Sequence, residues 1–180
     1  WHNNQIINYK TKKIVFSLIY AETIQYFDGD YVLSTGDYCD SPTFLYKFGG
    51  SMLLDGAIER LLKKEEAPLL GRDIVFMCSQ LHDGDDIEIG NIVETNIRVY
   101  DIADQRYKLE YKYEGDAEIC YDDFINQGLV IVKSKNGEKR LYDIVKEKWL
   151  FSVQGEIQME CVKRNYQDKF FSYSYITLPD

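Results

Sequence analysis

Histidine and proline are scarce in this chain, and no Cys-X-X-Cys pair occurs. The 180 residues include two histidines, His2 and His82, together with three prolines and four cysteines. So few histidines exclude a zinc finger of the usual kind and a Ser-His-Asp set. A phosphate-binding loop, Gly-X-Gly-X-X-Gly and Gly-X-Ser-X-Gly are also missing. We therefore expect no catalytic residue, no metal site and no cofactor.

Basic residues are outnumbered, with 21 Lys and Arg against 30 Asp and Glu and a net charge of −9. A nucleic-acid-binding protein needs basic surface that displaces counterions from phosphate. An anionic membrane likewise attracts basic segments, and no apolar run here reaches the ~18 residues of a membrane span. We expect neither nucleic acid nor membrane as a partner, and a charged protein partner should be basic. Acidity alone also keeps a protein soluble.

The cysteines follow a spacing that does not indicate a disulfide framework. Cys78, Cys120 and Cys161 recur at intervals of 42 and 41 residues, whereas Cys39 stands apart. Cysteines at equivalent places of apolar segments are typical of small buried core residues. The sequence therefore predicts a reducing compartment and a cytoplasmic location.

Two landmarks recur four times along the chain. An acidic residue opens a short β-like segment at Glu22, Asp73, Asp116 and Glu156. A tyrosine follows an aliphatic run at Tyr9, Tyr46, Tyr100 and Tyr142. The 15 tyrosines favour strands, and a regular internal period predicts a repeat architecture.

The clearest repeat lies between Gly115 and Gly155. We predict strands over 117–121, 128–134, 139–144 and 148–153, with a hairpin turn at Asn136-Gly137, where both residues tolerate a positive φ. Four antiparallel strands in ~40 residues are typical of a propeller blade. The preceding unit is expected to have strands at 74–80, 86–94, 96–102 and 107–113, and an earlier one at 22–27, 30–34 and 43–48.

An insertion and the two ends of the chain complete the predicted fold. Apolar residues at 54, 57, 58, 61 and 62 have helical spacing, and they predict a short helix near residues 54–66 with Asp55 as its N-cap. Strands are expected at 157–163 and 170–176, and at 5–9 and 13–18. We predict one all-β domain over residues 1–180, a four-bladed β-propeller-like arrangement in which the N-terminal strands complete the last blade. The alternative is a fragment of a larger propeller, or half of one completed by a second chain.

Parts of the chain resemble known propeller repeats. The unit from Gly115 to Val145 resembles a WD40-type repeat: Gly115-Asp116 stands at that family's Gly-His, while Leu141–Ile144 and Val99–Ile102 stand at its aliphatic-Trp-Asp-aliphatic segment. No repeat here has the His or the Trp, so the family's buried His-Asp-Ser-Trp network cannot form. The stretch Tyr121–Val132 is similar to bacterial WG repeats, without their Trp-Gly. The resemblance implies a propeller fold and carries no activity.

The leading acids are the candidate binding residues. If the four units are arranged radially, a ring at one end of the channel would be formed by Glu22, Asp73, Asp116 and Glu156. Such a ring would suit a cation, a basic side chain or a hydroxyl-rich ligand, and crowding would raise some of the pKa values. An acidic residue after a glycine turn is also ordinary solvated loop chemistry. The acidic loop His82–Glu88 does not match a calcium loop, because Gly84 comes too early.

These observations favour a non-enzymatic protein-binding module that presents an acidic loop face or channel mouth to a basic protein. Loops such as Thr35–Ser41 and His82–Asp86 would carry contacts. One alternative is a carbohydrate-active enzyme or lectin that uses the carboxylate ring, with an acid pair at the separation set by mechanism. Another is a structural fragment of a larger propeller assembly, in which an oligomer or a second chain would complete the propeller.

Overall fold

A computed structural model describes residues 5–18, 22–36, 42–68, 70–83, 90–121, 125–155, 157–166 and 169–177. The chain divides into two compact units, residues 1–60 and 61–180. In the described parts of both, the elements are β-strands and one 3₁₀ turn, η1 (Ile125–Gln127), with no α-helix. The chain is therefore all-β, as its composition predicts.

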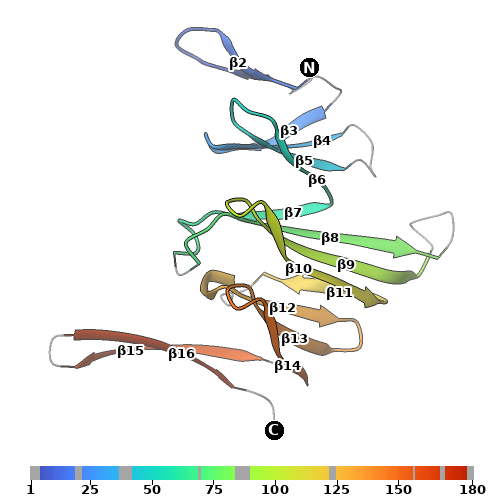
Figure 1. Ribbon diagram of the computed structural model, residues 1–180, viewed down its shortest axis with the longest axis vertical. Helices are drawn as coiled ribbons and strands as arrows, with labels where there is room; N and C mark the ends of the chain where they lie inside the picture. Colours follow the sequence, from blue (N-terminus) through green and yellow to red (C-terminus); the bar gives the residue numbers. More distant parts are fainter. Residues whose placement is uncertain are drawn as a thin grey trace. The chain divides into compact units, whose positions relative to one another are not determined.

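The N-terminal unit contains two antiparallel sheets (Figure 1). The smaller one pairs β1 (Gln5–Ile7) with β2 (Ile14–Ser17). The larger one follows chain order through β3 (Glu22–Phe27), β4 (Tyr31–Gly36), β5 (Thr43–Lys47) and β6 (Met52–Gly56). The ring of Phe16 packs against those of Tyr46 and Phe48, with centroids 5.8 and 6.1 Å away, so aromatic contacts join the two sheets.

The C-terminal unit contains two further meanders and a hairpin. The first sheet has the order β7 (Ile58–Leu62), β8 (Ile74–His82), β9 (Ile92–Asp101) and β10 (Arg106–Glu114), and its edge strand β7 spans the boundary between the units. The second has β11 (Ala117–Cys120), β12 (Leu129–Ser134), β13 (Glu138–Asp143) and β14 (Lys148–Gln154). The hairpin pairs β15 (Gln158–Tyr166) with β16 (Lys169–Thr177).

A buried core joins the two meanders of this unit. It includes Ile74, Phe76, Ile97 and Val99 of one sheet, and Ile119, Val130 and Val132 of the other. The side chains alternate along each strand, so one face of each sheet enters this core. At ~25 cal/mol per Å² of buried apolar surface, such a core is the main favourable contribution to folding.

One hairpin design recurs in β1–β2, β5–β6, β9–β10 and β13–β14. The second strand of each hairpin carries an extra residue that produces a β-bulge, at Val15, Leu53, Lys108 and Leu150. In three hairpins a short polar side chain then accepts hydrogen bonds from the backbone of the turn, at Asn8, Asp101 and Asp143. Four residues later the backbone has a positive φ of 57°, 52° and 53°, at Lys12, Gln105 and Glu147 respectively.

This hairpin confirms three of the predicted tyrosine landmarks as equivalent. Tyr46, Tyr100 and Tyr142 all occupy the third strand beside the bulge. In β1 the same register position belongs to Ile7, so the Tyr9 landmark was misplaced by two residues. The strands predicted between Gly115 and Gly155 agree with β11–β14 to within two residues at their ends.

The predicted helix near residues 54–66 is wrong. Residues 52–56 and 58–62 form strands β6 and β7, and Asp55 lies within β6 instead of capping a helix. Gly56, between them, has a φ of 137°, which an L side chain rarely adopts. Leu54, Ile58 and Leu62 are buried; their spacing of four places them on one face of a helix but also suits alternating strand positions.

Because the residues of β7 were predicted as part of a helix, each later strand of that repeat was assigned the wrong position in its sheet. β8, which follows Asp73, is the second strand of its sheet and not the first. Strands were predicted separately at 86–94 and 96–102, but the described residues of these segments, from residue 90 onward, form one strand, β9. Thr95, the residue between the two predicted strands, is buried: its hydroxyl donates to the carbonyl of Gly115 at 2.7 Å and accepts from the N–H of Ala117 at 3.1 Å.

Candidate functional site

Asp116 lies in the short connection between β10 and β11. Its half-buried carboxylate accepts a hydrogen bond from Nε2 of Gln80 at 3.1 Å, and its carbonyl accepts one from the N–H of Lys135 at 3.0 Å. Two hollows of about 270 and 420 Å³ share Asp116 and Lys135. Asp116 is therefore a predicted binding residue that the structure places beside open space.

The charge around Asp116 is mixed. Glu118 pairs with Lys133 at 3.2 Å, whereas Glu114, at the rim of the larger hollow, is exposed. Carboxylates thus flank Asp116 along β10 and β11, and Lys135 faces them from the turn after β12. This arrangement suits a ligand with a positive group that can compete with Lys135.

Asp73 is not brought to Asp116. Asp73 precedes β8, and one of its carboxylate oxygens accepts a hydrogen bond from the N–H of Lys64 at 2.9 Å. Gln80, the partner of Asp116, lies seven residues further along the same strand. At ~3.3 Å per residue this is about 20 Å, so the two acids lie at opposite ends of β8.

The other predicted acids do not complete a ring. Glu22 is the first residue of β3, in the N-terminal unit, and its side chain lies outside the described part of the structure. Glu156 lies outside the described residues altogether. Paired hydrolytic carboxylates stand ~5 to ~9.5 Å apart, so Asp73 and Asp116 cannot serve as such a pair.

The predicted loops are described only in part. Residues 37–41 and 84–89 lie outside the described ranges. At the base of the second loop, Nδ1 of His82 lies 3.2 Å from the carbonyl of Gly90, and the carboxylate of Asp83 accepts a hydrogen bond from the N–H of Asn91. Within the described ranges, no group of three His, Cys, Asp or Glu residues could hold a metal ion.

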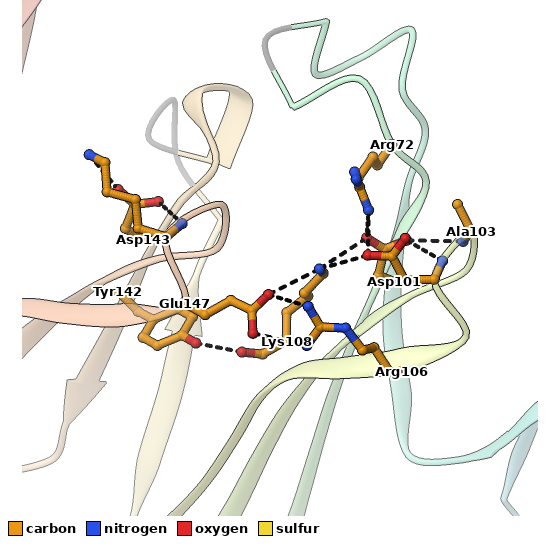
Figure 2. Close-up of polar contacts among 10 residues, drawn as sticks. Arg72, Asp101, Ala103, Arg106, Lys108, Tyr142, Asp143 and Glu147 are labelled. Atoms are coloured by element: carbon orange, nitrogen blue, oxygen red, sulfur yellow. Dashed lines mark hydrogen bonds and ion pairs between the residues drawn. The ribbon is translucent and has the colours of Figure 1, made fainter.

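A charged cluster absent from the sequence-based prediction surrounds the β9–β10 hairpin (Figure 2). The side chain of Asp101 is 0% exposed, and its Oδ1 accepts hydrogen bonds from the N–H groups of Ala103 at 2.9 Å and Asp104 at 3.1 Å. Its Oδ2 lies 2.7 Å from Nη1 of Arg72, which also reaches Oδ2 of Asp104 at 2.6 Å. A buried carboxylate is thus matched by a cation from the segment before β8.

Glu147 extends this cluster to the β13–β14 hairpin. Its carboxylate accepts two hydrogen bonds from the guanidinium of Arg106, and it lies 3.1 Å from Nζ of Lys108. Lys108, the bulge residue of β10, is 9% exposed and also lies 2.8 Å from Oδ2 of Asp104. The hydroxyl of Tyr142 donates to the carbonyl of Lys108. Figure 2 shows these contacts running from one hairpin to the other.

The ion pairs of this cluster shift several pKa values toward the charged forms. Hydrogen bonds from Arg106 and then Lys108 lower the pKa of Glu147 to about 2. Lys108 and Arg72 lower the pKa of Asp104, and Asp104 in turn raises the pKa of Lys108. Asp101 and Asp104 raise the pKa of Arg72. Three cations thus face three carboxylates, and their ion pairs link the two hairpins.

Comparison with known proteins leaves the chain unassigned. No family model and no curated protein matches it. Among solved structures it is similar to the computationally designed Ika8 protein, with a TM-score of 0.46 and 15% identity over 95% of this chain and 52% of that one. The computationally designed Ika4 protein gives 0.42 and 16%, over 87% and 92%. The chain spans about half the length of Ika8, and scores this low support no further argument.

The structure also bears on two other expectations. No helix in its described part is long and apolar enough to cross a membrane. Cys78 and Cys120 are half-buried, and each packs against a buried apolar cluster of the C-terminal unit. Cys39, and the side chain of Cys161, lie outside what the structure describes.

The charged cluster had a signal in the sequence. Tyr100-Asp101 and Tyr142-Asp143 align as repeat positions, and the next five residues of each repeat are rich in charge. An Asp that ends a strand ahead of a turn is a turn-capping residue. Applying that rule to both repeats would have placed the two turns in equivalent conformations, although not the ion pairs between them.

Proposed function

We propose that this chain is a non-enzymatic protein-binding module in which the hollows around Asp116 receive a basic side chain of a protein partner. The observation that supports this most is the position of Asp116, half-buried and shared by two hollows. The net charge of −9 would favour encounter with a basic protein. The antiparallel sheets would supply a rigid frame for the recognition surface.

The architecture we propose for this module is a four-bladed β-propeller. Three four-stranded meanders, β3–β6, β7–β10 and β11–β14, follow one another along the chain. β15 and β16 would be the first two strands of a fourth blade, and β1 and β2 its third and fourth. In support, the β1–β2 hairpin has the bulge, the polar turn residue and the positive φ found in β9–β10 and β13–β14.

A glycoside hydrolase that uses the ring of acids is not favoured. Asp73 lies about 20 Å along the chain from Gln80, the residue that contacts Asp116. This distance exceeds the separation of the two acids in enzymes that hydrolyse a glycosidic bond. The alternative proposal is a fragment that functions in a larger propeller assembly. Both proposals use the same observed sheets. They differ in which strands would pair with the two-stranded sheets β1–β2 and β15–β16.

Binding of a model basic ligand tests the lead proposal. A fluorescent decalysine peptide is titrated at low salt, and the affinities of the unmodified chain, Asp116→Asn and Glu65→Gln are compared. Each variant removes one charge, and Glu65 is exposed in the turn after β7. We expect Asp116→Asn to weaken binding about fivefold, the effect of about 1 kcal/mol, and Glu65→Gln to weaken it much less. Equal effects of the two variants would mean that only net charge matters and would refute the site.

A further inference from the structure

A hollow of about 490 Å³ lies beside the β1–β2 hairpin in the N-terminal unit. Its apolar walls come from the hairpin, through Ile7, Tyr9 and Val15, and from the neighbouring sheet, where Phe27 ends β3 and Phe48 follows β5. The rings of Phe27 and Phe48 pack together with centroids 4.8 Å apart. The volume lies within the ~300–1,000 Å³ range of small-ligand sites.

The apolar side chains around this hollow are open to solvent. Tyr9 is 75% exposed, Ile7 53%, Val15 43% and Phe27 40%. A single exposed apolar residue is ordinary on a protein surface. Several of them gathered around one space form an apolar patch, which is typical of a binding site.

The turn of the β1–β2 hairpin adds positive charge to a chain whose net charge is −9. Lys10 lines the hollow, Lys12 and Lys13 follow within three residues, and all three are exposed. In the described part of the structure, none of these ammonium groups has a carboxylate partner. Nζ of Lys10 lies 5.9 Å from the centroid of the Tyr9 ring. Positive charge that is not neutralised by an ion pair therefore borders the apolar walls.

The acceptor oxygens nearest to the hollow in sequence are engaged within their own turns. Oδ1 of Asn8, a lining residue, accepts hydrogen bonds from two backbone N–H groups at 3.0 and 3.1 Å. Oδ1 of Asp28, which follows Phe27, accepts two more, both at 2.8 Å. These oxygens cap turns, so the polar contribution of the site to a ligand would come from the lysines.

We propose that this hollow binds a fatty-acid anion, with its aliphatic chain against the apolar walls and its carboxylate near the lysines of the turn. Each CH₂ group that leaves water favours binding, and a carboxylate is a strong acceptor for ammonium donors. The same lysines would repel a cationic chain of equal length. The site is independent of the basic partner proposed at Asp116, which belongs to the other unit. It uses side chains of the hairpin and leaves the free backbone edge of β1 available.

The methyl groups of Ile7 give a direct readout. The full chain with ¹³C-labelled isoleucine methyl groups is titrated with sodium decanoate below its micelle-forming concentration and, separately, with decyltrimethylammonium bromide. The Ile7 resonances are assigned by their absence in Ile7→Val, and Ile119, in the buried core of the C-terminal unit, is the internal control. We expect a saturable shift of Ile7 with decanoate, with a Kd on the order of 0.1–1 mM, and binding at least about tenfold weaker for the cation.

Matched variants separate the charged part of the site from the apolar part. Lys10→Gln should weaken decanoate binding about threefold, whereas Lys64→Gln, at an exposed lysine of the C-terminal unit, should leave it unchanged. Tyr9→Ser should weaken it about fivefold, whereas Val145→Ser, at an exposed apolar residue of the C-terminal unit, should not. All four side chains are exposed, so the variants should fold, which far-ultraviolet circular dichroism checks.

Four outcomes would overturn the proposal. If Ile7 does not shift at any decanoate concentration below micelle formation, the hollow takes no fatty-acid chain. Equal affinities for decanoate and the cation would remove the role of the lysines. Undiminished binding by both Lys10→Gln and Tyr9→Ser would place the bound chain elsewhere. A shift of Ile7 that follows protein concentration and not decanoate would identify a second copy of this chain as the occupant.

Discussion

Asp101 and Asp143 occupy the same position in two hairpins but have different surroundings. Each ends the third strand of its sheet and caps the turn through Oδ1. Asp101 is fully buried between Arg72, Asp104 and Lys108, whereas the partner of Asp143 among the described residues is the exposed Lys146, at 3.0 Å. Hydrogen bonds and an ion pair from Lys146 outweigh the effect of burial and lower the pKa of Asp143. The capping role is common to both residues, and the buried pairing belongs to Asp101.

Alanine substitution should separate the two roles. Asp101→Ala removes the turn cap and the one fully buried carboxylate that Arg72 contacts, so that Arg72 keeps only its more exposed partner Asp104 among the described residues. We expect the free energy of unfolding to fall by about 3 kcal/mol, the lower end for breaking a buried ion pair. Asp143→Ala loses the cap and an exposed pair, for which we expect about 1 kcal/mol. Urea denaturation followed by tryptophan fluorescence measures both.

Asp101→Asn keeps the size of the side chain and therefore separates the loss of charge from the loss of volume in Asp101→Ala. The amide keeps an acceptor for Ala103 and Asp104 but loses the charge that faces Arg72, so its cost should lie between those of the two alanine variants. If Asp101→Ala and Asp143→Ala cost the same, the buried pairing contributes nothing beyond the cap, and the role given to Arg72 is wrong.

At the scale of elements, the β9–β10 and β13–β14 hairpins are joined by Glu147. Its backbone has a positive φ of 53°, and its side chain contacts Arg106 and Lys108 of the other hairpin (Figure 2). A carboxylate whose pKa is lower in the folded state stabilises that state above its unfolded pKa. This stabilisation is lost as the pH falls from the ordinary value of 4.5 to about 2.

The pH dependence of thermal unfolding tests this link. Glu147→Gln should have a lower Tm than the unmodified chain at pH 7, and the difference should shrink steadily between about pH 5 and pH 2 as Glu147 becomes protonated. Salt should reduce the difference as well, because the pair is partly exposed. Glu65→Gln, in an exposed turn, serves as the control and should follow the unmodified chain. Parallel Tm curves for Glu147→Gln and the unmodified chain across this range would contradict the assignment.

The β11–β14 meander could be predicted because its signals agree. Alternating apolar residues, a short Asn136-Gly137 turn and a regular spacing all indicate strands, and the turn forms as expected: Gly137 has a φ of 86°. The β6–β7 segment could not be assigned in the same way, because Leu54, Ile58 and Leu62 satisfy helix and strand patterns together. Only the pairing of β7 with β8, a contact distant in sequence, decides between them.

The site shows the same limit. The position of Asp116 at the start of a repeat predicts a binding residue, and the structure places Asp116 beside two hollows. The ring could not be predicted correctly from the repeat spacing. Asp73 was assigned to the start of a first strand, as Asp116 is, but β8 is the second strand of its sheet. Adjacent antiparallel strands begin at opposite ends of a sheet, so the two acids are not equivalent. Arg106 and Glu147 gave no local signal: they are 41 residues apart and meet only through contact between the β9–β10 and β13–β14 hairpins. Such ion pairs depend on how the hairpins pack, which local sequence patterns do not specify.

At the scale of the whole molecule, the proposed closure concerns sheet edges. Each of β1, β2, β15 and β16 belongs to a two-stranded sheet, whereas the three complete meanders in the described structure have four strands. Ile7, Ile14 and Val15 of the first hairpin are exposed. Unpaired strands with apolar side chains tend to recruit another strand. In the proposed fourth blade, β1 would pair with β16 and protect the backbone amides of both strands.

Hydrogen exchange measures this protection. We expect amides of β16 to exchange at least about tenfold faster after deletion of residues 1–18, while those of β12 and β13 stay unchanged as the internal control. Solution mass then identifies the source of the strands: closure within one chain gives 21.1 kDa, and completion by a second copy gives twice that mass. If the deletion leaves β16 exchange unaltered, β1 and β16 are not paired, and the four-bladed arrangement is wrong. Because the deletion removes no residue of β11–β14, a loss of protection confined to β16 cannot be attributed to general unfolding.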